Sequence, residues 1–432
     1  MKSKLLSSIC ICFVLIIAGC SGDEAEKDLT SIADNGMEKV QPPKGCDIVD
    51  IGDDEIPISW EYNMETDDEQ NTFQGGWYTN VYDTIYGTAD TNSTICYYNK
   101  NNMSKGLLCG KPDCEHNNPE TCNAHVSSIA GLQYYNEYLY TVDLGNGKEY
   151  KLKKISLDGA NREDLGNLTT VENLVGNGGA ISWIIHRGYI YYYYRCGASD
   201  TEEDTYYLNN SHCVYRMNLE DKTKECIMVF PSGSEMFECV LKGVGSYVYM
   251  IMPKNESEGG YLYRFNTETR QLEKLVSLGK DISDYAIYSD RLYYLKRTDM
   301  ERTVELYCFD YESKEKKLIE VIETDSWGMK CDDDYIYVST WDDKIDAGNE
   351  KMYDKTGKHI IDIPVKDTYT SSYSEHIYWG CTDSERIYLY KDIIAASSDD
   401  NIWGLMGNGY EELYFFEKSK LLNGEIKMES FN

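Results

Sequence analysis

Positively charged residues are scarce in this sequence. It contains 42 Lys and Arg against 74 Asp and Glu over 432 residues, which gives a formal net charge of −32. Nucleic acid and anionic lipid headgroups gain electrostatic free energy from a basic protein face and lose it at an acidic one. We therefore exclude nucleic acid as a partner and expect neutral ligands or small cations.

Motifs of the common catalytic sites are also missing. The chain has no G-x-S-x-G, H-E-x-x-H, G-x-x-x-x-G-K-[ST] or G-x-G-x-x-G motif, so a hydrolase elbow, a zinc protease and phosphate-binding loops lack their usual support. Asp332–Asp334 lacks EF-hand spacing, and we interpret it as a solvated turn. Four of the 6 histidines lie in or beside expected strands, where a structural role is commoner than general-base chemistry: His186, His212, His359 and His376.

The N-terminus has the parts of an export signal. Lys2 and Lys4 form a basic start, Leu5–Ala18 is largely apolar, and Gly19-Cys20 follows at once. The apolar stretch is short for a bilayer-spanning helix, which needs about 20 residues. This arrangement resembles the lipobox of bacterial lipoproteins. The resemblance implies a signal peptide over residues 1–19 and a lipid on Cys20, which anchors the exported chain to the outer face of the bacterial cytoplasmic membrane.

Residues 20–70 have the composition of a tether. Between Ser21 and Gln70 there are 16 acidic and 3 basic residues, a Pro42-Pro43 pair and few large apolar side chains. This is too little apolar surface to offset the entropy of ordering, so we expect a flexible segment that holds the folded part away from the bilayer. Ile56–Trp60 is the one apolar stretch, and we expect it to add an edge strand to the following domain.

A strand-like motif recurs seven times between residues 71 and 432. Its final tyrosines lie 44 to 58 residues apart, close to the length of a four-stranded propeller blade. With 39 Tyr and only 8 Pro, the composition also favours β-structure. We predict an all-β domain over residues 71–432, a β-propeller of seven four-stranded antiparallel blades, with six or eight blades as alternatives. The copies are Thr84–Tyr86, Tyr138–Tyr140, Tyr189–Tyr191, Tyr247–Tyr249, Arg291–Tyr293, Tyr335–Tyr337 and Arg386–Tyr388.

Packing between blades explains the abundance of tyrosine. A strand inside a blade is covered on both faces by neighbouring blades, so both sides of its pleat favour large apolar groups. Tyr189–Tyr194, with the sequence YIYYYY, is such a run. A tyrosine ring fills the space between sheets, while its hydroxyl reaches a backbone group or water at the blade edge.

The second unit carries a family resemblance. Leu139–Asp143 (LYTVD), followed by Lys154–Leu165 (KISLDGANREDL), resembles the YWTD-type propeller repeat, in which a Tyr-Trp-Thr-Asp strand precedes an I-x-x-x-x-L-D-G-x-x-R-x-x-L segment. YWTD propellers usually have six blades. Together with the lipobox, residues 1–430 resemble the uncharacterised surface propeller lipoproteins of Gram-positive bacteria. This resemblance implies a fold and a location, and its motifs say little about ligands.

Residues 109–125 form a Cys/His-rich insert after the first unit. Their spacing is C-x4-C-x-H-x5-C-x2-H. Thiols and imidazoles over so short a segment suit a tetrahedral zinc site. Three alternatives stay open: disulfides, which export favours, a structural zinc ion, and free thiols. The candidate residues are Cys109, Cys114, His116, Cys122 and His125.

The other cysteines are scattered along the chain. Many lie in expected strands, where a buried inert thiol is the common explanation. Cys196 and Cys213 differ, because the first ends one expected strand and the second begins the next. We therefore predict a disulfide between them across one hairpin.

Two classes of function fit this sequence. In the first, a non-enzymatic module binds a glycan, a peptide or an envelope protein through the loops on one face of the disc. We favour it because no catalytic set is visible and propellers need none. In the second, a lyase or hydrolase degrades extracellular polysaccharide at the central channel. Convergence of His, Arg and carboxylates at the mouth of that channel would favour the enzyme.

Overall fold

A computed structural model describes most of the chain after residue 77. The described residues are 48–50, 78–89, 94–116, 118, 120–126, 129–145, 149–170, 181–196, 211–231, 239–252, 260–279, 281–288, 290–298, 303–323, 325–342, 347–365, 368–369, 373–395 and 412–431. Cys20, the predicted signal peptide and Ile56–Trp60 lie outside these ranges. Within them, no helix is long and apolar enough to cross a membrane.

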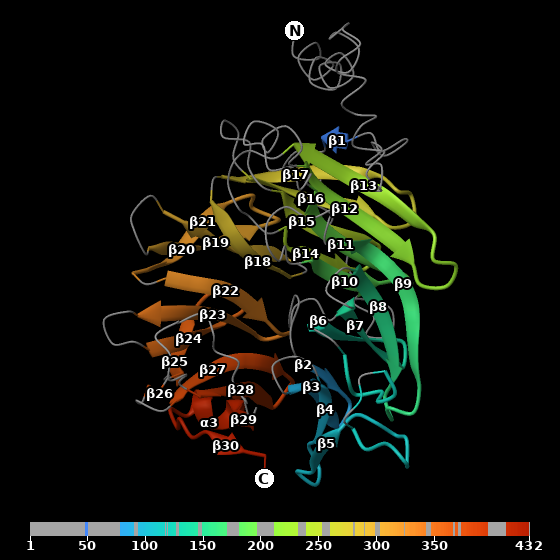
Figure 1. The fold of residues 1–432 in the computed structure, drawn as a ribbon. Helices are drawn as coiled ribbons and strands as arrows, with labels where there is room; N and C mark the ends of the chain where they lie inside the picture. Colours follow the sequence, from blue (N-terminus) through green and yellow to red (C-terminus); the bar gives the residue numbers. More distant parts are fainter. Residues whose placement is uncertain are drawn as a thin grey trace, which may run out of the picture.

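Seven sheets stand in a ring, and each contains four consecutive antiparallel strands (Figure 1). This confirms the predicted seven-bladed propeller. Blade 1 consists of β2 (Tyr78–Val81), β3 (Thr84–Ala89), β4 (Thr94–Asn99) and β5 (Lys105–Leu107), and blade 2 of β6 (Ile129–Tyr135), β7 (Tyr138–Gly145), β8 (Glu149–Ser156) and β9 (Arg162–Thr170). Blade 3 consists of β10 (Ser182–His186), β11 (Tyr189–Cys196), β12 (Ser211–Asn218) and β13 (Lys224–Pro231). Blade 4 contains β14 (Leu241–Val244), β15 (Tyr247–Met252), β16 (Gly260–Asn266) and β17 (Leu272–Gly279).

Blades 5 to 7 follow the same order, and blades 4 and 7 each carry a fifth strand. Blade 5 consists of β18 (Ile282–Ile287), β19 (Arg291–Arg297), β20 (Val304–Asp310) and β21 (Lys316–Ile322), and blade 6 of β22 (Asp325–Cys331), β23 (Tyr335–Asp342), β24 (Ala347–Asp354) and β25 (His359–Val365). Blade 7 consists of β26 (Thr368–Tyr369), β27 (Tyr373–Thr382), β28 (Arg386–Ala395), β29 (Glu412–Glu417) and β30 (Glu429–Ser430), with the helix α3 (Lys418–Leu422) between its last two strands. The fifth strand of blade 4 is β1 (Ile48–Asp50).

Each copy of the recurring motif occupies the same place in its blade. Thr84 begins β3, Tyr189 begins β11 and Arg386 begins β28, and the other four copies begin β7, β15, β19 and β23. In every blade this strand pairs with the strand before it and the strand after it. The motif therefore marks a strand that lies inside the sheet, which explains its large apolar residues on both faces.

The hydrophobic core lies between the blades. Six clusters of buried apolar side chains each join neighbouring blades. On β11, Tyr192 and Tyr194 pack in a cluster shared with blade 2, whereas Tyr191 and Tyr193 pack in a cluster shared with blade 4. None of these four side chains is more than 4% exposed. The tyrosine run is thus packed on both faces, as its sequence predicts.

Asparagine or aspartate closes the turn between the third and fourth strands of several blades. The Asn218 side-chain oxygen accepts a hydrogen bond from the N–H of Glu220 at 2.8 Å, and Asn266 and Asp310 make the corresponding bonds at 3.0 and 3.1 Å. A short polar side chain that accepts a hydrogen bond from the backbone N–H two residues later is a strong local signal for a turn. The turn is therefore encoded directly after the strand that precedes it.

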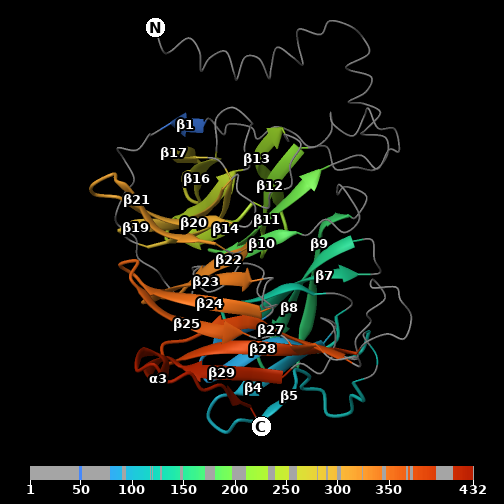
Figure 2. The same ribbon diagram turned by 90° about the vertical axis from the view of Figure 1, so that its left-hand side faces the viewer.

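The ring closes through side-chain packing between blades 1 and 7. In the described part of the chain, neither blade contributes a strand to the sheet of the other. Tyr78 of β2 stacks on Tyr390 of β28 with 4.9 Å between ring centroids, within a junction whose buried apolar cluster joins the two blades. Lys100 Nζ of blade 1 also lies 3.1 Å from Asp383 Oδ2 of blade 7. Figures 1 and 2 both show these blades side by side.

Part of the predicted tether forms a strand. β1 pairs in parallel with β17, the outer strand of blade 4, with Ile48 opposite Leu272 (Figure 2). The sequence places an edge strand at Ile56–Trp60, which the structure does not describe, and the edge strand that it does describe lies upstream. A fifth strand covers an edge whose backbone groups would otherwise face solvent. The N-terminal segment therefore meets the propeller at blade 4.

Gly87 provides a test of the idea that side-chain packing between blades 1 and 7 closes the ring. A Cβ at this residue would overlap the ring of Tyr78. We expect Gly87→Ala to lower the free energy of unfolding by about 1–3 kcal/mol, as overpacking does, in urea denaturation. Gly106→Ala is the control, because its Cβ would meet only the half-buried Tyr97, at 3.0 Å, and should cost less than about 0.5 kcal/mol. Equal effects of the two substitutions would contradict closure by tight packing.

Candidate metal centre

The Cys/His-rich insert connects β5 of blade 1 to β6 of blade 2 and belongs to the folded propeller. Both of its ends bond to β4: the Leu108 N–H donates to the Ile95 carbonyl at 2.9 Å, and the Ile95 N–H donates to the Ala124 carbonyl at 2.8 Å. Cys122 and Ala124 are fully buried. The insert is thus held in place at both ends, independently of any bond between its thiols.

Glycines let the insert touch the turn between β8 and β9 of blade 2. Gly159 in this turn has φ +68°, and a Cβ there would lie 2.6 Å from the Leu108 carbonyl group and 2.8 Å from the Cys109 nitrogen. A Cβ on Gly110 would lie 2.6 Å from the Asp158 carbonyl oxygen. The Asn123 side chain donates to the carbonyls of Gly159 and Ala160, both at 2.8 Å. Such close backbone approach explains why glycine stands at both places.

Arg162, the first residue of β9, holds the far end of the insert. Its Nη1 donates to the Cys122 carbonyl at 2.8 Å and also to the His125 carbonyl. A guanidinium carries several N–H groups in one rigid plane, so one side chain can fix two carbonyls. Arg162 and Asn123 therefore attach the segment around Cys122 to blade 2.

The structure brings four of the five predicted residues together. The ligand atoms of Cys109, Cys114, His116 and Cys122 all lie within 4.8 Å of one another, and His116 Nδ1 is 3.4 Å from Cys122 Sγ. His125 is not in this group and instead forms an isolated β-bridge with Thr94. Three sulfurs and one ring nitrogen are a donor set that can hold a metal ion.

Burial and hydrogen bonds act in opposite directions on these thiols. Burial raises the pKa of Cys109, but donation by the backbone N–H groups of Lys111 and Asn123 and contacts with Cys114 and Cys122 outweigh it and lower the pKa to about 6. Burial is the main cause that raises the pKa of Cys122. Cys109 is therefore the more readily ionised of the two, and the thiolate is the form that reacts and binds metals.

The other predicted cysteine pair lies on a diagonal of the β11–β12 ladder. Cys196 is opposite Ser211, and Cys213 is opposite Tyr194. Diagonal neighbours on one face of a sheet are about 7–8 Å apart, beyond the Cα separation of most disulfides. A disulfide between Cys196 and Cys213 stays a prediction, and it would require a local shift of the backbone.

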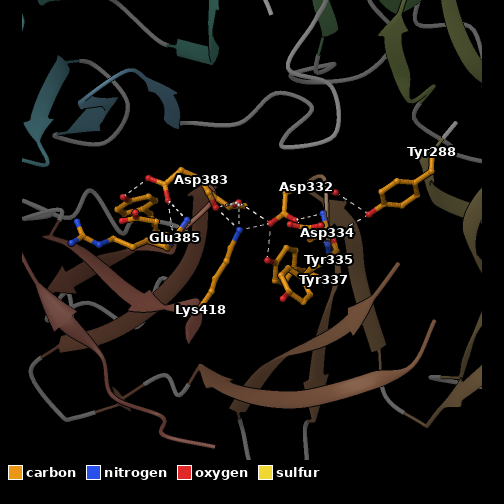
Figure 3. A network of polar contacts seen from close by, with 11 residues as sticks. Tyr288, Asp332, Asp334, Tyr335, Tyr337, Asp383, Glu385 and Lys418 are labelled. Carbon is orange, nitrogen blue, oxygen red and sulfur yellow. Dashed lines mark hydrogen bonds and ion pairs between the residues drawn. The ribbon is translucent and has the colours of Figure 1, made fainter. Parts of the chain in front are cut away.

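A second cluster of charged groups surrounds Asp332, in the turn before β23 (Figure 3). Its Oδ1 accepts hydrogen bonds from the N–H groups of Asp334 and Tyr335 at 3.0 and 2.9 Å, and its Oδ2 accepts one from the Tyr337 hydroxyl at 2.7 Å. Asp333 and Asp334 are exposed, as expected for a solvated turn. Asp332 departs from that expectation, because its side chain is only 12% exposed.

Lys418, at the start of α3, joins Asp332 to blade 7. Its Nζ donates to Asp332 Oδ2 at 2.7 Å, to Thr382 Oγ1 at 3.3 Å and to the Asp383 carbonyl (Figure 3). The Thr382 hydroxyl also donates to Asp332 Oδ2, at 2.9 Å. Sequence reasoning missed Lys418, because it lies 86 residues from Asp332 and no local pattern connects them.

Asp383 repeats the turn of Asp332 in blade 7. It accepts hydrogen bonds from the N–H groups of Glu385 and Arg386 and, at 2.7 Å, from the Tyr388 hydroxyl. Burial raises the pKa of Asp383, but these hydrogen bonds and the Lys100 ammonium outweigh it, and the pKa falls below its usual value. An Asp followed by a Tyr five residues later is a signal that could have located both turns in the sequence.

His186 serves a structural role of the kind predicted for the scattered histidines. It is fully buried, and its Nε2 lies 2.8 Å from the Gly245 carbonyl oxygen of blade 4. His359 is exposed and pairs with Asp362 at 2.8 Å on the same strand. A histidine whose ring nitrogen bonds a neighbouring blade fixes the junction between the two sheets.

No known family profile matches this chain, and its sequence matches no curated protein. Several solved structures have a similar fold. The acylaminoacyl peptidase of Pyrococcus horikoshii shares 12% identity over 81% of this chain, with a TM-score of 0.47, and this chain spans only 50% of its length. An oligogalacturonate lyase in complex with manganese shares 10% over 74% of this chain and 93% of its own, with a TM-score of 0.45.

A third similar structure is the β-propeller domain of the Trilobed protease from Pyrococcus furiosus, which is described as having an open velcro topology. It shares 9% identity over 84% of this chain and 96% of its own, with a TM-score of 0.47. These likenesses concern the fold alone. The activities named for those proteins are not assigned to this chain.

The pKa of Asp383 gives its contribution to stability a pH dependence. Because the pKa is lower in the folded protein, the contribution is complete above the unfolded value of about 3.9 and is lost as the pH falls through the folded value. We expect Asp383→Asn to lower the free energy of unfolding by about 1–3 kcal/mol at neutral pH, with a deficit that shrinks below about pH 4. Urea denaturation across this pH range measures both.

Asp333→Asn is the matched control for this substitution. It removes an exposed carboxylate from the equivalent turn of blade 6, so its effect should stay within about 0.5 kcal/mol at every pH. A deficit for Asp383→Asn that is the same in acid and at neutral pH would show that the carboxylate charge does not stabilise this junction.

Proposed function

We propose that this protein is a lipid-anchored propeller on the outer face of a bacterial cytoplasmic membrane. We further propose that it is a non-enzymatic binding or scaffold module for a glycan, a peptide or an envelope protein. The observation that carries the second part is the saturation of the charged groups Asp332, Lys418 and Arg216 by partners within the fold. A catalytic acid or base has to offer a proton or a lone pair to the substrate.

Asp332 and Lys418 illustrate this saturation. Asp332 accepts five hydrogen bonds, two on one carboxylate oxygen and three on the other. Lys418 donates to three acceptors, which uses every N–H bond of an ammonium group. Arg216 in blade 3 is only 4% exposed and bonds Glu225 and the Thr267 carbonyl of blade 4. These groups join strands and blades, and they are poorly placed to act on a substrate.

The N-terminal sequence supports the membrane location. The lipobox ends at Cys20, and the first described strand, β1, begins at Ile48. The residues between them span at most about 100 Å when fully extended. The anchor would then hold the disc near the bilayer by the outer edge of blade 4. The resemblance to Gram-positive propeller lipoproteins, with its YWTD-like unit at Leu139–Asp143, belongs to the same proposal.

The alternative function is an extracellular polysaccharide lyase or hydrolase. Such an enzyme requires a general acid and base that face an accessible site with unused bonding capacity. The charged groups around Asp332 and at Arg216 have their partners within the fold, so we favour the binding module.

Cys20 tests the membrane part. In a bacterial host that processes lipoproteins, the wild-type chain should enter the detergent phase of Triton X-114, because two acyl chains add far more apolar surface than one side chain. Mass spectrometry should find the lipid on the N-terminal cysteine. Cys20→Ala should lose both properties, whereas Cys10→Ala, inside the signal peptide, should keep them. An unmodified Cys20 in the wild type would contradict the anchor.

Residues 21–432, which include every described strand, serve to test binding against catalysis. The purified protein is applied to arrays of envelope glycans, polysaccharides and peptides, and the same polysaccharides are assayed for new reducing ends and unsaturated products. We expect saturable binding by the folded protein, none by the heat-unfolded protein, and no products. Product formation proportional to protein concentration would contradict a non-enzymatic role.

A further inference from the structure

We propose that Cys109, Cys114, His116 and Cys122 bind one Zn²⁺ ion in a closed tetrahedral site. This site would fasten the insert at the junction of blades 1 and 2. The inference does not depend on the ligand-binding role proposed above, because it concerns a site built from a different part of the chain. It rests on the positions of the four donors and on the backbone groups around them.

The separations of the donor atoms fit tetrahedral coordination. Zn–S bonds of about 2.3 Å and a Zn–N bond of about 2.0 Å place the ligand atoms about 3.5–3.8 Å from one another. His116 Nδ1 and Cys122 Sγ are 3.4 Å apart, and all four donors lie within 4.8 Å. Small side-chain rotations therefore convert this arrangement into a coordination sphere.

The backbone around the cluster is suited to thiolate ligands. The N–H of Lys111 donates to the Cys109 sulfur, and the N–H of Ala124 donates to the Cys122 sulfur. In both turns the donor is two residues after the cysteine. An N–H group aimed at a sulfur stabilises the negative charge that a metal-bound thiolate retains, and it orients the ligand.

Two cations lie close to the insert. Arg162 donates to the Cys122 carbonyl at 2.8 Å, and Lys111 Nζ donates to the Thr121 carbonyl at 2.6 Å. Three thiolates, one neutral imidazole and Zn²⁺ carry a net charge of −1, which these cations offset. On binding, each thiol proton leaves to the solvent and a sulfur–zinc bond replaces it.

Zinc accounts for the cluster better than a disulfide does. A disulfide joins two sulfurs about 2.05 Å apart, so it would leave the third sulfur and the imidazole without a role. Cys109, Cys114 and Cys122 are all present as thiols in the structure. A Zn²⁺ ion uses all four donors and leaves no open coordination position, which is typical of a structural rather than a catalytic site.

The position of the cluster defines what the ion would do. Leu108 and Ala124, which flank the segment from Cys109 to Cys122, bond to β4, and Cys109 lies against Gly159 in the blade 2 turn. Zinc would close this segment into one rigid unit that bridges two blades. Removal of the ion should therefore loosen the insert first, while the remaining blade junctions keep their packing.

The experiment uses residues 21–432, purified with reductant and zinc and then freed of unbound metal. Elemental analysis should find one zinc per chain, and X-ray absorption should show about three sulfur and one nitrogen ligands at about 2.3 and 2.0 Å. Replacement of zinc by Co²⁺ should give the intense visible bands of a tetrahedral thiolate site. These measurements on the wild type do not depend on the folding of any variant.

Variants then test the ligand set. Loss of a residue that only supports a metal ligand usually weakens metal binding by about 10–100-fold. Cys114→Ser and His116→Ala each remove a ligand itself, so each should weaken zinc binding by more than that. His125→Ala is the matched control: it removes a neighbouring imidazole outside the group of four and should retain one zinc per chain. Circular dichroism verifies that each variant is folded.

Three results would overturn the proposal. The first is a wild-type protein that holds no zinc under these conditions. The second is a disulfide among Cys109, Cys114 and Cys122, detected by mass spectrometry after the remaining thiols have been alkylated. The third is loss of zinc in His125→Ala with retention in His116→Ala, which would show that His125, and not His116, is the nitrogen ligand.

Discussion

Closure of the ring is the constraint on which the rest of this structure depends. Among the described residues, blade 1 contains only β2–β5 and blade 7 only β26–β30, so no exchanged strand ties the two blades together. The two blades instead meet through Tyr78, Tyr390 and a shared cluster of buried apolar side chains. Side-chain packing must then supply at this junction the free energy that backbone hydrogen bonds supply within a blade. Large aromatic residues suit this task, because each buries much apolar surface at a small cost in conformational entropy.

Polar groups at the junctions form hydrogen bonds between neighbouring blades. His186 reaches the Gly245 carbonyl of blade 4, and the Tyr288 hydroxyl donates to the Asp332 and Tyr335 carbonyls of blade 6 at 3.0 and 3.1 Å. Lys418 bonds the same turn from blade 7. A buried polar group is costly without a partner, and these bonds form only when neighbouring blades are in register. The bonds that align the ring therefore engage His186, Tyr288 and Lys418 within the fold.

The sequence predicts this fold through local patterns that recur. The motif at Tyr189 identifies a strand with two buried faces, and the spacing of its copies gives seven blades. The Cys/His spacing likewise locates a cluster, because its members lie within one short insert. Contacts between distant segments carry no such signal, as with Lys418 and Asp332. The sequence pattern also does not reveal every neighbour in space: His125 lies close in sequence to the other candidate ligands, yet it forms a β-bridge with Thr94 and is not in the group of four.

Native-state hydrogen exchange would test closure by side-chain packing most directly. The account predicts that amides of β2 and β27, on either side of the junction of blades 1 and 7, exchange only through global unfolding, with the same free energy as amides of β11 in the middle of the chain. Exchange of β2 and β27 at a much lower free energy, while β11 stays protected, would show that the ring opens readily at this junction. That result would contradict the claim that side chains alone hold the first and last blades together.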